Sequence, residues 1–306
     1  MLKNHRGELY LLLGALTFSF NGVVSTVVLE HMSAFRLAQI RAISAFLILL
    51  VFALIRNRSA LKFSRREIPL LLLYGIIGFA LVNVGYFLGI KRGLPLGLVL
   101  IIEFTAPIWV VLWIKYIRKG FVARDMWGAI LLALIGLVLV SKAWEGFAFD
   151  FLGTCGALGS AIALTGYFLL GEKVLADRTP IAATIIGLGV AGLFWALVLP
   201  IWNFPTEIFS MRMDIHGYLA GDFLPGWALL LWVVVMGTIV PYICVINGLS
   251  LLDASKSSAI GMLEPVLASA FAWIWLSQRW SLIQIIGAIV VLIGIYLADK
   301  SKSTSE

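Results

Sequence analysis

The sequence predicts an all-α polytopic membrane protein with ten transmembrane helices in two inverted five-helix repeats. Three observations support this prediction. The 306-residue chain is 61% hydrophobic and only 13% charged, which is about half the charged share of an ordinary soluble domain. Apolar stretches close to the roughly 20 residues that cross a bilayer recur along the whole length. Sequence features of the first half also return in the second half at a nearly constant spacing.

The ten predicted spans follow from the alternation of apolar stretches with charged residues, proline and glycine. They cover residues 9–29, 34–55, 68–90, 94–116, 125–142, 151–171, 180–202, 226–250, 255–277 and 281–299. Pro95 and Pro180 fall in the first turn of a span, where helices tolerate proline. Pro107, Pro241 and Pro265 fall inside spans, where we expect them to bend or break the helix.

The distribution of charge predicts how the chain is oriented. Most of its 23 Lys and Arg residues lie on the side of the membrane that holds the N-terminus, and basic loops favour the cytoplasmic side. We therefore expect a multi-pass protein of the inner cell membrane with both termini in the cytoplasm. The apolar run after Lys3 and Arg6 is longer than a signal-peptide core and lacks a small-residue cleavage site, which predicts a retained first span. Five tryptophans lie toward the outer ends of spans, as in an interfacial belt: Trp144, Trp202, Trp227, Trp275 and Trp280.

Several other kinds of protein are disfavoured by the same data. The net charge of +7 does not indicate nucleic-acid binding, because the basic residues lie between apolar segments and form no basic face with interleaved aromatics. Cys155 and Cys244 lie within apolar segments and match no metal-ligand or redox spacing. We expect no metal, no cofactor and no nucleic-acid partner. The expected partners are the lipid bilayer and a small-molecule substrate, for a chain that acts as a monomer or a homodimer.

An internal repeat divides the chain at about residue 146. The matching positions are Gly7 with Gly153, 146 residues apart, and Pro107 with Pro265 and Gly136 with Gly294, 158 residues apart. A longer connection between spans seven and eight, around residues 214–222, accounts for the difference. We expect the halves to be residues 1–146 and 147–306 of one integrated membrane domain. Because each half has an odd number of spans, the second enters the membrane from the opposite side, as in many secondary transporters.

Three segments resemble a known family of membrane proteins. The segments PLGLVLIIEFTAPIW (95–109) and SSAIGMLEPVLASA (257–270) resemble spans four and nine of the EamA-type drug/metabolite transporter superfamily, and SLIQIIGAI (281–289) resembles its tenth span. With ten spans and two EamA-like halves, the resemblance covers essentially the whole chain. The run from Pro95 is similar to the threonine/homoserine exporter branch, which implies export of small amino acids or related metabolites.

Two glutamates are predicted near the middle of the bilayer. Glu103 and Glu264 each lie about nine residues inside a span, which at 1.5 Å per residue is roughly 13 Å deep. Under the repeat they are displaced by three residues, a spacing that keeps them on one helix face. Because intramembrane charge is costly, we expect one or both to line a central cavity, where they bind a substrate amine or take up a coupling proton. The alternative is a structural acid, protonated or bonded to backbone freed by the adjacent proline.

Other polar residues within spans complete the candidate site. Arg41 lies about seven residues from the outer end of span two. Its guanidinium suits a substrate carboxylate, but pairing with an acid such as Glu103, or snorkelling to the interface, are alternatives. Six uncharged polar residues suit the orientation of a small zwitterion: Asn21, Gln39, Asn83, Tyr86, Tyr167 and Tyr242. Taken singly, each is also typical of an interhelical hydrogen bond.

These features favour a secondary transporter that exports amino acids of the threonine/homoserine kind by alternating access, with proton coupling as an option. The nearest alternative is a multidrug or organic-cation efflux carrier, but spans one and six hold no acid at their centres. An enzyme is disfavoured because no HExxH or paired-aspartate motif is present and His5, His31 and His216 fall in predicted loops. A channel is disfavoured because an internally duplicated ten-span chain encloses its own pathway.

Overall fold

The computed structural model confirms the predicted fold class. It describes residues 5–56, 58–94, 96–141, 150–275, 281–301 and 303–304. Within these ranges, ten helical spans are long and apolar enough to cross a membrane. The unbroken spans are α1 (Arg6–His31), α2 (Ala34–Arg56), α7 (Arg124–Ser141), α8 (Phe151–Leu175), α9 (Pro180–Val198) and α14 (Leu282–Lys300).

The remaining four spans each consist of consecutive segments. Span three joins α3 (Ile68–Gly75) to α4 (Val82–Lys91) through a π-helical segment, Ile76–Leu81. Span eight likewise joins α10 (Gly226–Val234) to α11 (Val240–Leu249) through a second π-helical segment, Val235–Ile239. Span four contains α5 (Leu96–Glu103), α6 (Ala106–Leu112) and a π-helical end, Trp113–Ile117, and span nine contains α12 (Ala254–Gly261) and α13 (Leu263–Trp275).

Proline accounts for three of these irregularities. A proline inside a helix lacks the N–H of one backbone hydrogen bond and collides with the preceding turn. In span four the helix stops at Glu103 and restarts at Ala106, just before Pro107. In span nine it stops at Gly261 and restarts at Leu263, two residues before Pro265. Pro241 instead follows the π-helical segment of span eight, and π-helical turns are frequent at functional sites.

Helix ends are fixed by local side-chain chemistry. Asp150 caps α8, because its carboxylate accepts a hydrogen bond of 2.6 Å from the Gly153 N–H. Ser281 and Gln284 form a capping box at the start of α14. α9 ends at Val198 and not at residue 202 as predicted, because Pro200 disfavours helical backbone in the residue before it.

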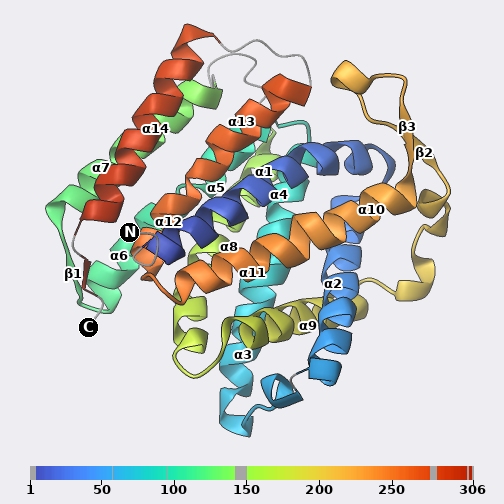
Figure 1. Ribbon diagram of the computed structural model, residues 1–306, viewed down its shortest axis with the longest axis horizontal. Coiled ribbons are helices and arrows are strands. Elements are labelled where there is room, and N and C mark those ends of the chain that lie inside the picture. Colours follow the sequence, from blue (N-terminus) through green and yellow to red (C-terminus); the bar gives the residue numbers. More distant parts are fainter. Residues whose placement is uncertain are drawn as a thin grey trace.

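The helices pack closely where small residues let backbones meet. α7 and α14 run side by side along one edge of the molecule (Figure 1). A Cβ added to Gly136 would lie 2.8 Å from the Gly287 carbonyl oxygen, and one added to Gly294 would lie 2.8 Å from the Ala129 carbonyl oxygen. α10 and α11 form one long rod beside α1. Such close contacts are how helices associate in lipid, where apolar burial gives little driving force between them.

The outer surface of the helices is apolar, as a lipid environment requires. Ile55 and Leu197, for example, are 82% and 77% exposed, and exposed large apolar side chains are found on nearly every span, which suits lipid contact better than water. Trp202 and Trp227 are also exposed, whereas Trp275 is half-buried and donates from its indole N–H to the Ile215 carbonyl. Trp144, Trp280 and Pro95 lie outside the described residues.

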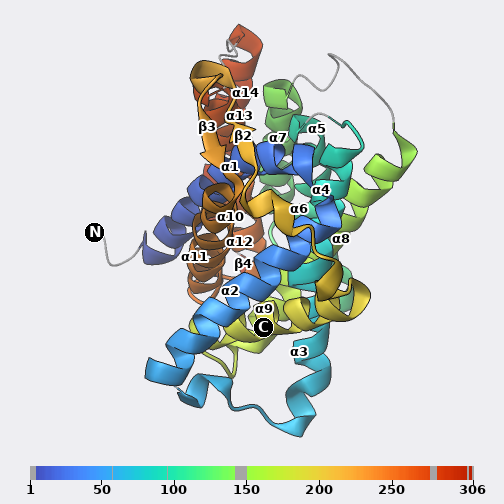
Figure 2. The same cartoon turned by 90° about the vertical axis from the view of Figure 1, so that its right-hand side faces the viewer.

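The long connection between spans seven and eight holds an antiparallel hairpin. Its strands are β2 (Arg212–Asp214) and β3 (Phe223–Pro225), which lie at the opposite edge of the molecule from α7 and α14 (Figure 1). A second short pair, β1 (Phe121–Val122) with β4 (Ser303–Thr304), joins the end of span four to the C-terminal segment. Turned by 90°, the molecule is elongated, with α3 at one end and α14 at the other (Figure 2).

Candidate functional site

A cavity of about 90 Å³ lies between the four interrupted spans and α1, α2 and α8. It has room for a few water molecules or a small ligand. It is lined by eight of the nine candidate binding or coupling residues: Asn21, Arg41, Asn83, Tyr86, Glu103, Tyr167, Tyr242 and Glu264. Apolar and aromatic residues that include Phe18, Phe104 and Phe168 complete the wall. A mostly apolar pocket with a few convergent polar groups is typical of a small-molecule site.

Arg41 is held by the π-helical segment of span eight. Its side chain is 4% exposed. Its Nε–H donates to the Thr238 hydroxyl at 2.9 Å, and a terminal N–H donates to the Gly237 carbonyl at 2.7 Å. The guanidinium also lies 5.1 Å from the centre of the Phe87 ring, within the range of a cation–π contact. Within the described part of the chain it forms no ion pair, so the alternative of a pair with an acid such as Glu103 is not found in this structure.

Two features of the π-helical segment make this arrangement fit. The Thr238 hydroxyl donates to the Val233 carbonyl at 2.8 Å, five residues earlier, so its oxygen is free to accept from Arg41. Asn21 of α1 packs directly on Gly237, because an added Cβ there would lie 1.8 Å from the Asn21 Oδ1. That oxygen is buried, lines the cavity, and has no hydrogen-bond partner among the described residues.

Glu103 is the more enclosed of the two acids. It is 6% exposed and ends α5, at the interruption of span four. Its Oε1 lies 2.6 Å from the hydroxyl oxygen of Ser160 on α8. A buried acid needs such a partner, because burying an unpaired charge in a low-dielectric environment is costly. Glu103 is therefore anchored to the cavity wall by a single hydroxyl.

Glu264 differs in its surroundings. It is half-buried, lies in the first turn of α13, and borders the same cavity. Its backbone carbonyl accepts from the Ser19 hydroxyl at 2.8 Å. Its carboxylate makes no hydrogen bond or ion pair with any residue in the described ranges. The cavity therefore contains one acid held by the protein and one whose oxygens are available to a ligand.

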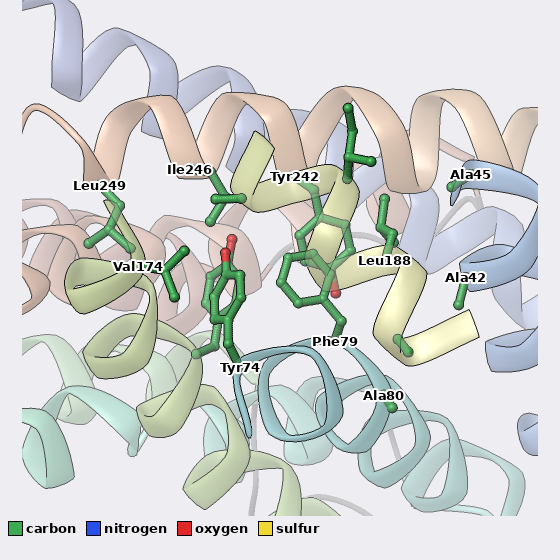
Figure 3. Packing of buried hydrophobic residues seen from close by; sticks show 14 of the residues in the cluster. Ala42, Ala45, Tyr74, Phe79, Ala80, Val174, Leu188, Tyr242, Ile246 and Leu249 are labelled. Carbon is green, nitrogen blue, oxygen red and sulfur yellow. The ribbon is translucent and has the colours of Figure 1, made fainter. Parts of the chain in front are cut away.

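Aromatic residues form one side of the cavity. The rings of Tyr242 and Phe79 stack with their centres 4.4 Å apart, and Tyr242 points from α11 toward Phe79 (Figure 3). The Tyr242 hydroxyl accepts from the Asn83 amide at 2.7 Å. Tyr167 packs edge-on against Phe79 at 5.5 Å, and its buried hydroxyl has no partner within the described residues. This wall offers polar atoms on an otherwise rigid apolar surface.

Gln39 has a structural role away from the cavity. It is 1% exposed, and its amide donates to the carbonyls of Trp195 and Leu199 at 3.1 and 2.6 Å. Its Oε1 accepts from Arg36 at 2.7 Å. Gln39 thus satisfies free carbonyls at the C-terminal end of α9. This is an interhelical hydrogen bond, the alternative to a role in substrate binding.

Three polar residues of the site were not identified from the sequence. Thr238 holds Arg41, Ser160 holds Glu103, and Ser257 lines the cavity with a buried hydroxyl that has no partner within the described residues. Serine and threonine are common in transmembrane helices, where they bond their own backbone, so their residue type alone gives no signal. The described residues contain no group of three His, Cys, Asp or Glu side chains placed to hold a metal ion.

Interrupted helices around a cavity with buried charges are typical of secondary transporters. The chain belongs to the EamA-like transporter family, whose model matches residues 5–142 and again residues 151–298. It is therefore a multi-pass membrane protein of a transporter family.

Individual relatives are distant. The chain is 27% identical to the threonine/homoserine exporter RhtA of Salmonella typhimurium over 76% of this chain and 71% of that protein. It is 22% identical to the uncharacterized inner membrane transporter YicL of the same species over 97% of this chain and 96% of that protein. It is 21% identical to the uncharacterized transporter YdfC of Bacillus subtilis over 87% of this chain and 80% of that protein. A solved crystal structure, 16% identical, matches 95% of this chain and 96% of that chain with a TM-score of 0.75, which shows the shared fold.

Proposed function

We propose that this protein is a secondary carrier that exports small amino acids of the threonine/homoserine kind across the inner membrane. The observation that carries the proposal is the presence of a positive and a negative side chain on the wall of one cavity. Arg41 supplies a fixed cation, and Glu264 supplies a carboxylate that has no partner among the described residues. A zwitterionic amino acid has one group for each, because its carboxylate suits a guanidinium and its ammonium suits a carboxylate.

The size and walls of the cavity support a small substrate. A volume of about 90 Å³ is well below that of drug-sized sites. The similarity to an exporter of threonine and homoserine points to the same class of molecule. A carrier for organic cations fits less well, because a buried guanidinium in the cavity repels a second cation.

Alternating access is the proposed mechanism, with two inverted halves rocking around the cavity. One pair of matched contacts supports inverted halves. Asn21 packs on Gly237, and Tyr167 packs on Gly78, where an added Cβ would lie 3.0 Å from the Tyr167 ring. Tyr167 follows Asn21 by 146 residues and Gly237 follows Gly78 by 159, close to the offsets of the repeat. Each contact joins the first span of one half to the third span of the other.

Substrate counterflow tests the function directly. Purified protein in liposomes preloaded with unlabelled threonine should accumulate labelled threonine or homoserine, and larger amino acids should compete poorly. Absence of exchange with every small amino acid, but exchange with an organic cation, would overturn the proposal.

The Glu264→Gln variant tests the proposed amine site. A hydrogen bond to a charged group contributes about 1.5–3 kcal/mol, so we expect exchange to fall roughly 10- to 100-fold at subsaturating substrate. The fold should persist, because Pro265 and the Ser19 contact to the backbone are unchanged. Glu207→Gln, in the exposed connection between spans seven and eight, is the matched control and should exchange normally. Unchanged exchange by a folded Glu264→Gln protein would contradict the assignment.

A further inference from the structure

Ser160 lies where three spans meet. It is on α8 and has no exposed surface. Its hydroxyl oxygen is 2.6 Å from Oε1 of Glu103 in span four and 2.9 Å from the backbone carbonyl oxygen of Val82 in span three. Val82 is the first residue of α4, directly after the π-helical segment of that span. One hydroxyl therefore contacts both an acid of the cavity and the irregular part of a neighbouring helix.

Counting hydrogens shows that the two contacts depend on the charge of Glu103. A serine hydroxyl has one hydrogen to donate, and a backbone carbonyl has none. If Glu103 is ionised, it can only accept, so Ser160 donates either to Glu103 or to Val82. Both contacts are full hydrogen bonds only when Glu103 carries a proton and donates it to the Ser160 oxygen, while Ser160 donates to Val82.

Few other groups near Glu103 can bond its carboxyl or carry a charge beside it. Glu103 shares the cavity with five other titratable groups: Arg41 from α2, Tyr86 from α4, Tyr167 from α8, Tyr242 from α11 and Glu264 from α13. Among the described residues, none of these five bonds the Glu103 carboxyl. The buried face of α7 supplies only apolar and small residues. Ser160 is thus the group that bonds the Glu103 carboxyl directly.

We propose that Ser160 is a positioning residue that couples the protonation of Glu103 to span three. With a proton on Glu103, the hydroxyl bonds Val82 and ties spans three, four and six together. When the proton leaves to water in the cavity, the hydroxyl turns to the carboxylate and releases the Val82 carbonyl beside the π-helical segment. The role of this switch in coupling rests on the proposed transport function. The hydrogen-bond switch itself does not depend on that function.

Infrared titration of the purified protein tests the switch without any substrate. The band of a protonated carboxyl that is lost in Glu103→Gln reports on Glu103, and its pH midpoint is measured in the wild type and in Ser160→Ala. With a proton on Glu103 the hydroxyl makes two neutral bonds, and with Glu103 ionised it makes one bond that is roughly twice as strong, so Ser160→Ala removes similar amounts from both forms. We therefore expect the midpoint to move by less than about one pH unit and the band to move to the frequency of a less strongly bonded carboxyl. A hydroxyl that bonded only the carboxylate would instead raise the midpoint by about one pH unit or more when removed.

Two further variants separate this role from simple packing. Ser19 is the matched control, because it is 1% exposed and its hydroxyl contacts the carbonyls of Ala15 and Glu264 but no carboxylate of the described residues. Ser19→Ala should leave both the Glu103 band and its midpoint unchanged. Ser160→Cys keeps the size of the side chain with a weaker donor and should give a band position between those of the wild type and Ser160→Ala.

The outcomes are decisive in both directions. A midpoint raised by about one pH unit or more in Ser160→Ala, an unmoved carboxyl band in that variant, an equal band shift in Ser19→Ala, or no Glu103 band at any pH would overturn the proposal. In counterflow, the pH dependence of exchange should flatten in Ser160→Ala, because protonation of Glu103 then no longer changes a bond to span three. If the wild-type protein exchanges no amino acid while the shift of the carboxyl band is found, the transport proposal fails and the switch stands.

Discussion

At the scale of single residues, Arg41 gives the sharpest prediction. Thr238 and Gly237 occupy two of its N–H groups, which fixes the guanidinium at the cavity. We expect Arg41→Gln to lose roughly 10- to 100-fold in affinity for amino acids, since a bond to a charged group contributes about 1.5–3 kcal/mol. Competition by threonine and by its amide, which lacks the carboxylate, measures the effect. The wild type should prefer the acid and the variant should not.

A control is needed because Arg41 also supports the fold. Thr238→Val removes one hydrogen bond to Arg41 and keeps the guanidinium, so its preference for the acid over the amide should persist. If Arg41→Gln keeps that preference, Arg41 is structural and the carboxylate site lies elsewhere.

Some residues of the site could be identified from the sequence and others could not, and the reason is physical. Charge and amide groups are rare in a bilayer, so Glu103, Glu264 and Arg41 stand out from their apolar surroundings. Whether such a group faces the cavity depends on helix rotation, which one sequence does not fix. Gln39 shows this, because it lies within the same span as Arg41 but bonds the end of α9.

At the scale of elements, hydropathy predicted the spans because the bilayer sets their length, and the structure confirms the ten spans within a few residues. Proline predicted the irregular regions near 107, 241 and 265, since its effect on a helix is local. The π-helical segment Ile76–Leu81 contains no proline. The segment packs against α8 and α9, and such tertiary contacts cannot be derived from one sequence.

The start of α8 gives a pH prediction at this scale. Hydrogen bonds from the Arg92 side chain and from the Gly153 N–H hold the pKa of Asp150 below its ordinary value. A lowered pKa means that Asp150 stabilises the fold above its unfolded-state pKa of about 3.9. That contribution is lost as the pH falls through the lower, folded-state value.

The measurement is the melting temperature in detergent between pH 7 and pH 3. Asp150→Asn keeps an N-cap but not the charge, so we expect a lower melting temperature at pH 7 and a smaller fall on acidification than in the wild type. Asp177→Asn, an exposed acid in the connection between spans six and seven, should follow the wild type. Parallel curves for Asp150→Asn and the wild type would contradict this account.

At the scale of the whole molecule, the inverted arrangement depends on how many times the chain crosses the membrane. Ser19 of α1 bonds the Glu264 carbonyl, and Thr165 of α8 bonds the Ala106 carbonyl at 3.4 Å. Thr165 follows Ser19 by 146 residues and Glu264 follows Ala106 by 158. These matched contacts across the halves support a repeat whose second copy enters from the opposite side, because five crossings precede it.

Labelling with a membrane-impermeant maleimide tests that topology. In a background without the native Cys155 and Cys244, single cysteines replace Lys62, Asp177 and Asp222, all in exposed connections. Two, six and seven spans precede these positions. Lys62→Cys and Asp177→Cys should therefore react on one side of the membrane and Asp222→Cys on the other. The contact of Arg178 with Glu67 already joins the first two connections.

The side of the membrane from which each cysteine reacts tests the orientation predicted from the distribution of charge. With the basic connections in the cytoplasm, Lys62→Cys and Asp177→Cys should label only in inside-out vesicles, and Asp222→Cys only in intact cells. Reaction of Lys62→Cys and Asp222→Cys from the same side would leave an even number of crossings between them. The halves would then be parallel, and rocking of inverted repeats around the Arg41 and Glu264 cavity would lose its structural basis.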